Sequence, residues 1–73
     1  MDTGDGTAAD QLTSRELLAL QLLAHGYSVA RIAAVLIVSS REVEALLTSA
    51  AARLGARDRP EAVAVARQRR LIV

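Results

Sequence analysis

Two helical patterns separated by a tight turn occupy residues 28–54, which read SVARIAAVLIVSSREVEALLTSAAARL. Ser28 is placed to cap the first helix, which we expect over about 29–36. The side chains predicted to face inward from it are Ile32, Ala33 and Leu36. Ser39 or Ser40 caps the longer helix, which runs to about residue 54. Its apolar residues recur at intervals of four, three and four, at Val43, Leu47, Ala50 and Leu54. The sequence therefore predicts a helix-turn-helix pair.

A further helix is predicted on each side of this pair. Thr13 and Glu16 have the spacing of a capping box, which begins a helix over about 14–25. The apolar residues of that helix are Leu17, Leu20, Leu23 and Ala24. Pro60 suits the first position of a last helix that runs to about residue 70. That helix is predicted to bury Ala62, Val63 and Ala66. We expect an all-α, four-helix domain over 12–73, preceded by a flexible acidic tail over 1–11.

Composition limits the chain to one small domain with a core of small aliphatic side chains. The chain has 73 residues, no cysteine and a single aromatic residue, Tyr27. Neither disulfides nor thiolate metal ligands are available. The start lacks the basic and apolar regions of a signal peptide, and no segment is long and apolar enough to span a membrane. We therefore expect a cytoplasmic protein.

Charge divides unevenly between the tail and the domain. All nine basic residues are arginine, and all nine follow residue 11, whereas the tail carries three aspartates. Residues 12–73 combine the nine arginines with five carboxylates, which leaves a net charge of +4. A domain with this charge suits a polyanionic partner such as DNA.

Residues 12 to about 71 resemble the LuxR/GerE-type helix-turn-helix domain of bacterial response regulators and quorum-sensing regulators. The resemblance is carried by Leu12-Thr13-Ser14-Arg15-Glu16, Leu20, Leu22, Ala24, Gly26, Ser28, Ile32-Ala33, Leu36, Val38-Ser39, Val43, Leu47, Leu54-Gly55, Arg59 and Ala62-Val63. It implies that the helix over 40–54 lies in the major groove of double-stranded DNA and that the last helix supplies a homodimer contact. On this interpretation the protein is a small stand-alone bacterial transcription regulator.

The outward residues depart from the family pattern in places. The longer helix presents one arginine and two glutamates: its outward residues are Arg41, Glu42, Glu44, Ala45, Thr48, Ser49 and Ala52. The family usually has Thr at position 42 and His at position 46, where this chain has Glu42 and Leu46. Leu18 stands where the family favours Glu. Such apolar changes mark either a protein interface or compensated core substitutions, and both interpretations stay open.

The leading hypothesis assigns two sets of residues to DNA. Arg41, Glu44, Ala45 and Thr48 face base edges, and Arg53, Arg57 and Arg59 hold phosphates. An equally ordinary role for arginines near a helix end is to complement its dipole. The rival hypothesis is a protein-interaction module derived from this scaffold, with little or no DNA binding. Its possible interface comprises Leu17, Leu18, Leu46, Val65, Leu71 and Ile72.

An enzyme is not expected, and we predict no catalytic residue, cofactor or metal site. Glu42 and Glu44 are two residues apart and so point to different sides of a helix, which does not suit paired acid/base catalysis. His25 is the sole imidazole, with no second candidate ligand or nucleophile near it in the sequence. We interpret it as structural.

Overall fold

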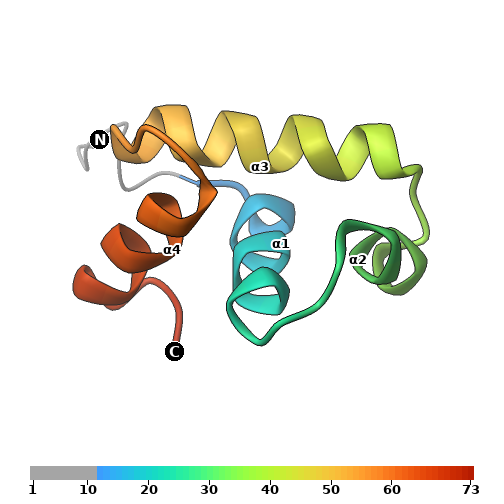
Figure 1. Cartoon of the computed structure of the whole chain (residues 1–73), viewed down its shortest axis with the longest axis horizontal. Coiled ribbons are helices and arrows are strands. Elements are labelled where there is room, and N and C mark those ends of the chain that lie inside the picture. The colour runs from blue at the N-terminus through green and yellow to red at the C-terminus, as the bar shows by residue number, and fades with distance from the viewer. Residues whose placement is uncertain (1–11) are drawn as a thin grey trace, which may run out of the picture.

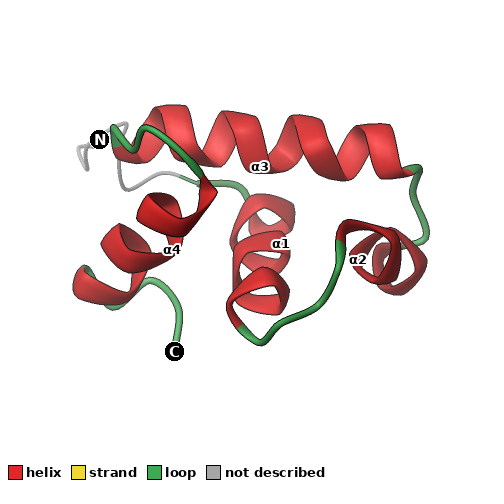
Figure 2. Ribbon diagram, in the orientation of Figure 1, coloured by secondary structure: helices red, strands yellow, loops and turns green. Residues whose placement is uncertain are grey.

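Residues 12–73 fold into four α-helices, as the sequence predicts (Figure 2). The computed structural model describes residues 12–73, so the predicted tail over 1–11 lies outside the described residues. In chain order the helices are α1 (Ser14–Ala24), α2 (Val29–Leu36), α3 (Ser40–Leu54) and α4 (Arg59–Gln68). No strand occurs within 12–73. None of the helices in this region is long and apolar enough to cross a membrane.

Helix α3 is the longest element and organises the rest of the fold. Each of α1, α2 and α4 packs against it. Figure 1 shows all three on the same side of α3, so its opposite side stays uncovered. The N-terminal end of α3 lies near α2, and its C-terminal end lies near α4. The fold thus presents one face of a 15-residue helix to the outside.

Side-chain caps define where the helices begin. Thr13 and Glu16 form the predicted capping box at α1. Ser28 caps α2, and Ser39, rather than Ser40, caps α3 by accepting from the amide of Glu42 at 3.0 Å. Helix α4 begins one residue before the predicted Pro60, because Asp58 takes the capping position. It ends at residue 68, two residues short of the prediction.

The turn between α2 and α3 contains a strained residue. Ile37 has a φ of 58°, in the left-handed region that β-branched residues rarely adopt. Its backbone amide donates to the carbonyl of Ala33 and closes α2. The side chain is 88% exposed, so burial does not offset the strain. By contrast, the turns after α1 and α3 place glycines in this region, Gly26 at φ 90° and Gly55 at φ 70°.

The core lies between α3 and the other three helices. Its largest fully buried side chains are Leu20, Ile32, Val43 and Leu47. The predicted inward row of α3 is buried throughout. Some predicted core residues are only half-buried, namely Leu17, Leu23, Ala24, Leu36 and Val63. Ala19 and Ala51 are buried although periodicity did not select them. Alanine at these positions lets helices approach closely, so a core without aromatic side chains can still be densely packed.

The C-terminal residues turn back toward α1. The amide of Leu71 donates to the carbonyl of Ala66 at 2.8 Å, and the amide of Val73 donates to Oε1 of Gln21 at 3.2 Å. This path places Ile72 in the core, where it is only 7% exposed. The prediction that Ile72 faces a partner is therefore wrong, because the residues after α4 bury it within the same chain.

Candidate nucleic-acid interface

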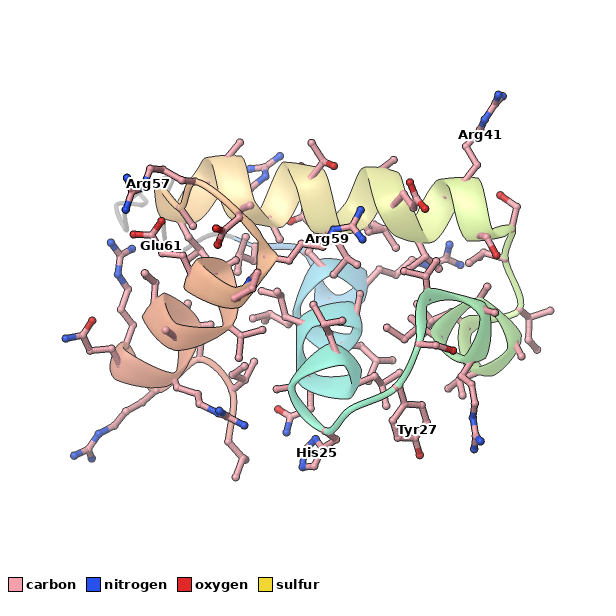
Figure 3. All side chains as sticks on the ribbon, viewed as in Figure 1. His25, Tyr27, Arg41, Arg57, Arg59 and Glu61 are labelled. Atoms are coloured by element: carbon pink, nitrogen blue, oxygen red, sulfur yellow. The ribbon has the colours of Figure 1, made fainter. Side chains whose placement is uncertain are left out.

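The uncovered side of α3 is the candidate interface. Its exposed residues are Arg41, Glu42, Glu44, Ala45, Thr48, Ala52 and Arg53. Figure 3 shows Arg41 projecting from the N-terminal end of α3, away from the other helices. A helix of this length extends about 22 Å, which suits insertion along a DNA groove. Ser49, predicted to face outward, is half-buried instead.

Four of these residues form a central row along the helix. They recur at intervals of four, three and four, at Arg41, Ala45, Thr48 and Ala52. We call them the central row. The row contains one cation, two methyl-bearing small residues and one hydroxyl, and it contains no carboxylate. Because residues advance by about 100° each around a helix, Glu42 and Glu44 fall on opposite flanks of this row.

Each flanking carboxylate has an arginine from another part of the fold beside it. Nη1 of Arg15, on α1, lies 3.4 Å from Oε2 of Glu42. Nη2 of Arg59, at the start of α4, lies 3.9 Å from Oε1 of Glu44. These pairs are partly exposed, and such pairs contribute only about 0 to 1 kcal/mol each. Their electrostatic effect is to reduce the negative potential of the face, since each glutamate has a positive charge close by.

A buried polar cluster joins α3 to α1 on the Glu42 flank. Glu16 is only 3% exposed, and its Oε2 accepts a 2.6 Å hydrogen bond from Oγ of Ser49. Its Oε1 accepts from the amide of Thr13 at 2.8 Å. Nε of Arg53 lies 3.4 Å from Oε2 of Glu16. The helices are thus joined by a carboxylate whose two oxygens both have partners.

The environment of Glu16 lowers its pKa. Burial alone raises the pKa by disfavouring the charged form. The hydrogen bonds from Ser49 and Thr13 and the positive charge of Arg53 outweigh burial, so the pKa lies below its ordinary value of 4.5. The sequence predicts the capping box of Glu16 but carries no local signal for its contact with α3, because Ser49 lies 33 positions away.

Arg57 and Arg59, two of the predicted phosphate-binding arginines, lie beside a groove at the C-terminal half of α3. This open groove has a volume of about 570 Å³. It is lined by Leu47, Thr48, Ala51, Ala52, Ala56, Arg57, Asp58, Arg59 and Pro60. The side chain of Arg57 is 91% exposed, and its Nε lies 3.4 Å from Oε1 of Glu61. The groove brings Arg57 and Arg59 together with Thr48, whereas Arg53 lies on the opposite flank with Glu16.

The predicted apolar interface is less exposed than expected. Leu17, Leu46, Val65 and Leu71 are half-buried and pack against the core. Leu18 is 43% exposed. Two exposed apolar residues that sequence analysis did not select are more accessible, Val35 at 51% and Ile37 at 88%. These three side chains belong to α1, α2 and the turn after α2, and a fourth exposed apolar side chain, that of Val73, follows α4.

His25 has a local structural contact. Its Nδ1 lies 2.8 Å from the carbonyl oxygen of Gln21 at the end of α1. Figure 3 places His25 at the far end of the fold from α3. Within residues 12–73, no group of three or more His, Cys, Asp or Glu side chains is arranged to hold a metal ion.

Together, these features define a small helix-turn-helix domain in which α3, the second helix of the pair, is exposed. A family model, GerE, described as bacterial regulatory proteins of the luxR family, matches residues 10–66. The chain therefore belongs to the luxR family. Membership implies DNA binding in transcription regulation, a regulatory rather than an enzymatic role. No curated protein and no solved structure matches the chain significantly.

Proposed function

We propose that this domain binds double-stranded DNA with α3 in the major groove and regulates transcription there. The observation that carries the proposal is the uncovered face of α3, whose central row contains a cation and no carboxylate. Among the predicted base-facing residues, Arg41, Ala45 and Thr48 meet base edges. Glu44 lies at the edge of this face, where its carboxylate is 3.9 Å from the guanidinium of Arg59. Such a regulator acts in the bacterial cytoplasm, beside the chromosome.

Arginines around α3 hold the phosphates on either side of the groove. Arg57 and Arg59 line the groove beside the C-terminal half of α3, from which the guanidinium of Arg59 reaches Glu44, and Arg53 lies on the other flank. Each already has a carboxylate within 4 Å. Exposed pairs of this kind rearrange at little cost, so a phosphate can replace or share the carboxylate of Arg57 and Arg59. Arg53 is less able to move, because its partner Glu16 is buried.

The domain acts as a homodimer in this proposal, with α4 at the two-fold axis. The exposed side of α4 carries Ala64, a small residue that lets two helices approach, and Val65 is half-buried beside it. A two-fold arrangement presents two copies of α3 to successive turns of DNA. Sedimentation at high micromolar concentration tests this part. A monomer throughout that range, with and without DNA, contradicts it.

A salt titration of binding to labelled genomic DNA fragments tests DNA binding itself. We expect affinity to fall steeply with salt, and Arg57→Gln to reduce the slope of log affinity against log salt by about 1. Arg70→Gln is the matched control, since it removes one charge from the turn that follows α4. The absence of binding at low salt contradicts the proposed function.

A contact with another protein is a second candidate function. The observation that favours it is the exposure of the apolar side chains of Leu18, Val35 and Ile37, none of which belongs to α3. The test compares capture of host proteins by the wild type and by a Val35→Asp, Ile37→Asp variant that keeps its helical circular dichroism. Equal capture by both contradicts this candidate.

A further inference from the structure

We propose that this domain selects a DNA half-site in which Arg41 reads a guanine and the methyl groups of Ala45 and Thr48 contact a thymine two or three base pairs away. The inference rests on the proposed function, because it specifies which bases the exposed face of α3 prefers. It depends on three observations: the lack of a partner for Arg41, the small side chains that follow it, and the pairing of both flanking glutamates.

Arg41 differs from most arginines of the domain in having no internal partner. Within residues 12–73 its side chain makes no hydrogen bond or ion pair, and it projects outward from α3 (Figure 3). Arg15, Arg53 and Arg59, which surround α3, each lie within 4 Å of a carboxylate. All the N–H donors of the Arg41 guanidinium are therefore available to bind DNA. Its commonest specific partner in the major groove is guanine, which presents the acceptors N7 and O6 side by side.

The next residues of the central row lack long side chains. Ala45, Thr48 and Ala52 let the helix approach the floor of the groove closely. Two of these, Ala45 and Thr48, offer methyl groups within the first three turns of the helix, the part that enters the groove in helix-turn-helix proteins. An apolar contact of this kind favours the C5 methyl group of thymine. The pattern accordingly selects a thymine rather than a second guanine.

Helix geometry sets the spacing between the two bases. Ala45 lies about 6 Å from Arg41 along the helix axis, and Thr48 lies about 10 Å from it. Base pairs are stacked about 3.4 Å apart. With α3 along the groove, the residues therefore meet bases separated by about two to three steps.

The two glutamates do not define the site in this arrangement. A free carboxylate on the face would accept from N4 of cytosine. Here Glu42 has Arg15 within 3.4 Å and Glu44 has Arg59 within 3.9 Å, each on a flank of the central row. Cytosine recognition by either residue requires breaking its pair and bringing the carboxylate toward the negative phosphates. Arg41 has no pair to break, and its positive charge is attracted to the phosphates.

Selection from a pool of randomised DNA duplexes at low salt is the primary test. The expected result is an enriched half-site with a guanine and a thymine two or three base pairs apart. A preference for a G·C pair that disappears with Glu44→Gln and persists with Arg41→Gln overturns the inference, because it assigns the reading of that pair to Glu44. Binding without base preference overturns this inference alone. No binding to any duplex overturns the proposed function together with it.

Base analogues in the selected site test each contact separately. Replacing the guanine with 7-deazaguanine removes the N7 acceptor, and we expect roughly a tenfold loss of affinity for the wild type. The same replacement leaves Arg41→Gln unaffected, since the contact is already absent. Replacing the thymine with uracil removes one methyl group and costs roughly fourfold. The matched control Arg70→Gln keeps the wild-type response to both analogues. A wild-type response in Arg41→Gln overturns the assignment of guanine to Arg41.

Discussion

The hydroxyl of Ser49 donates a 2.6 Å hydrogen bond to the buried carboxylate of Glu16 and so joins the exposed helix α3 to the start of α1. The same carboxylate closes the capping box with Thr13 and lies 3.4 Å from Nε of Arg53. A charged group of this kind is stable in the interior only because its oxygens have donors. The orientation of α3 relative to α1 therefore depends on a polar contact as well as on the apolar core.

Replacing Ser49 with alanine is predicted to destabilise the domain by about 1 to 3 kcal/mol, because one oxygen of a buried carboxylate loses its strongest neutral donor. Urea denaturation followed by circular dichroism measures the change. Thr48→Ala is the matched control, since Thr48 is exposed one position earlier on α3. Its stability is expected to stay within about 0.5 kcal/mol of the wild type. Equal effects of the two substitutions contradict the role given to Ser49.

The lowered pKa of Glu16 predicts acid sensitivity. Because the pKa is lower in the folded state than in the unfolded state, the unfolded chain binds more protons at acid pH. Glu16 then contributes stability above the pKa of the unfolded chain, and this contribution is lost as pH falls through the lowered pKa of the folded state. Urea denaturation of the wild type and Glu16→Gln between pH 7 and pH 2.5 measures it. The difference in stability between the two proteins should shrink as pH decreases; a constant difference contradicts the prediction.

Ile37→Asn is predicted to stabilise the domain by about 1 kcal/mol. Asparagine tolerates the left-handed conformation better than isoleucine does, and the 88% exposed side chain of Ile37 contributes little burial. Thermal unfolding measures the gain. Val35→Asn serves for comparison. Val35 is also exposed but lies within α2, and asparagine favours turns over helix interiors, so this substitution should not stabilise the domain. A loss of stability in Ile37→Asn means that the side chain has contacts that outweigh the strain.

Glu42→Gln is predicted to raise affinity for DNA severalfold at low salt. Removing this carboxylate leaves Arg15 without its partner at the edge of α3 and reduces repulsion of the phosphates. The gain should disappear at high salt, where charges are screened. Gln68→Arg, at the end of α4, is the control for net charge, because it raises the charge of the domain by the same amount without removing the partner of a phosphate-binding arginine. If both substitutions change affinity equally, the effect belongs to overall charge and not to the face of α3.

Local signals in the sequence were sufficient for most of the fold. The capping residues Thr13, Ser28 and Ser39, together with the apolar row of α3, predicted where the helices lie, and the family resemblance predicted their arrangement. These signals act within a few residues, so one sequence contains them. The two ends of α4 were harder to place. Asp58 caps its start one residue earlier than predicted, and the residues after Gln68 leave the helix to bury Ile72.

The candidate site was predicted only in part. Periodicity identified most exposed residues of α3, but Ser49, predicted to face outward, is half-buried, and the exposed Arg53 was not in the predicted set. It did not indicate that Arg15 pairs with Glu42 across 27 positions, or that Ser49 reaches Glu16 across 33. The Arg15–Glu42 contact, like the Arg59–Glu44 contact, changes the electrostatic character of the face, since the two glutamates that made it look unsuited to DNA have arginines beside them.

By itself, then, the sequence determined the four helices, their caps and the inward row of α3, because these follow from interactions between residues close in the chain. Tertiary structure alone decided which charges on α3 are paired, that Ile72 is buried, and that Arg41 stands without a partner beside a row of small residues. Those properties depend on distances between residues far apart in the chain, and such distances exist only once the helices have packed around a common core.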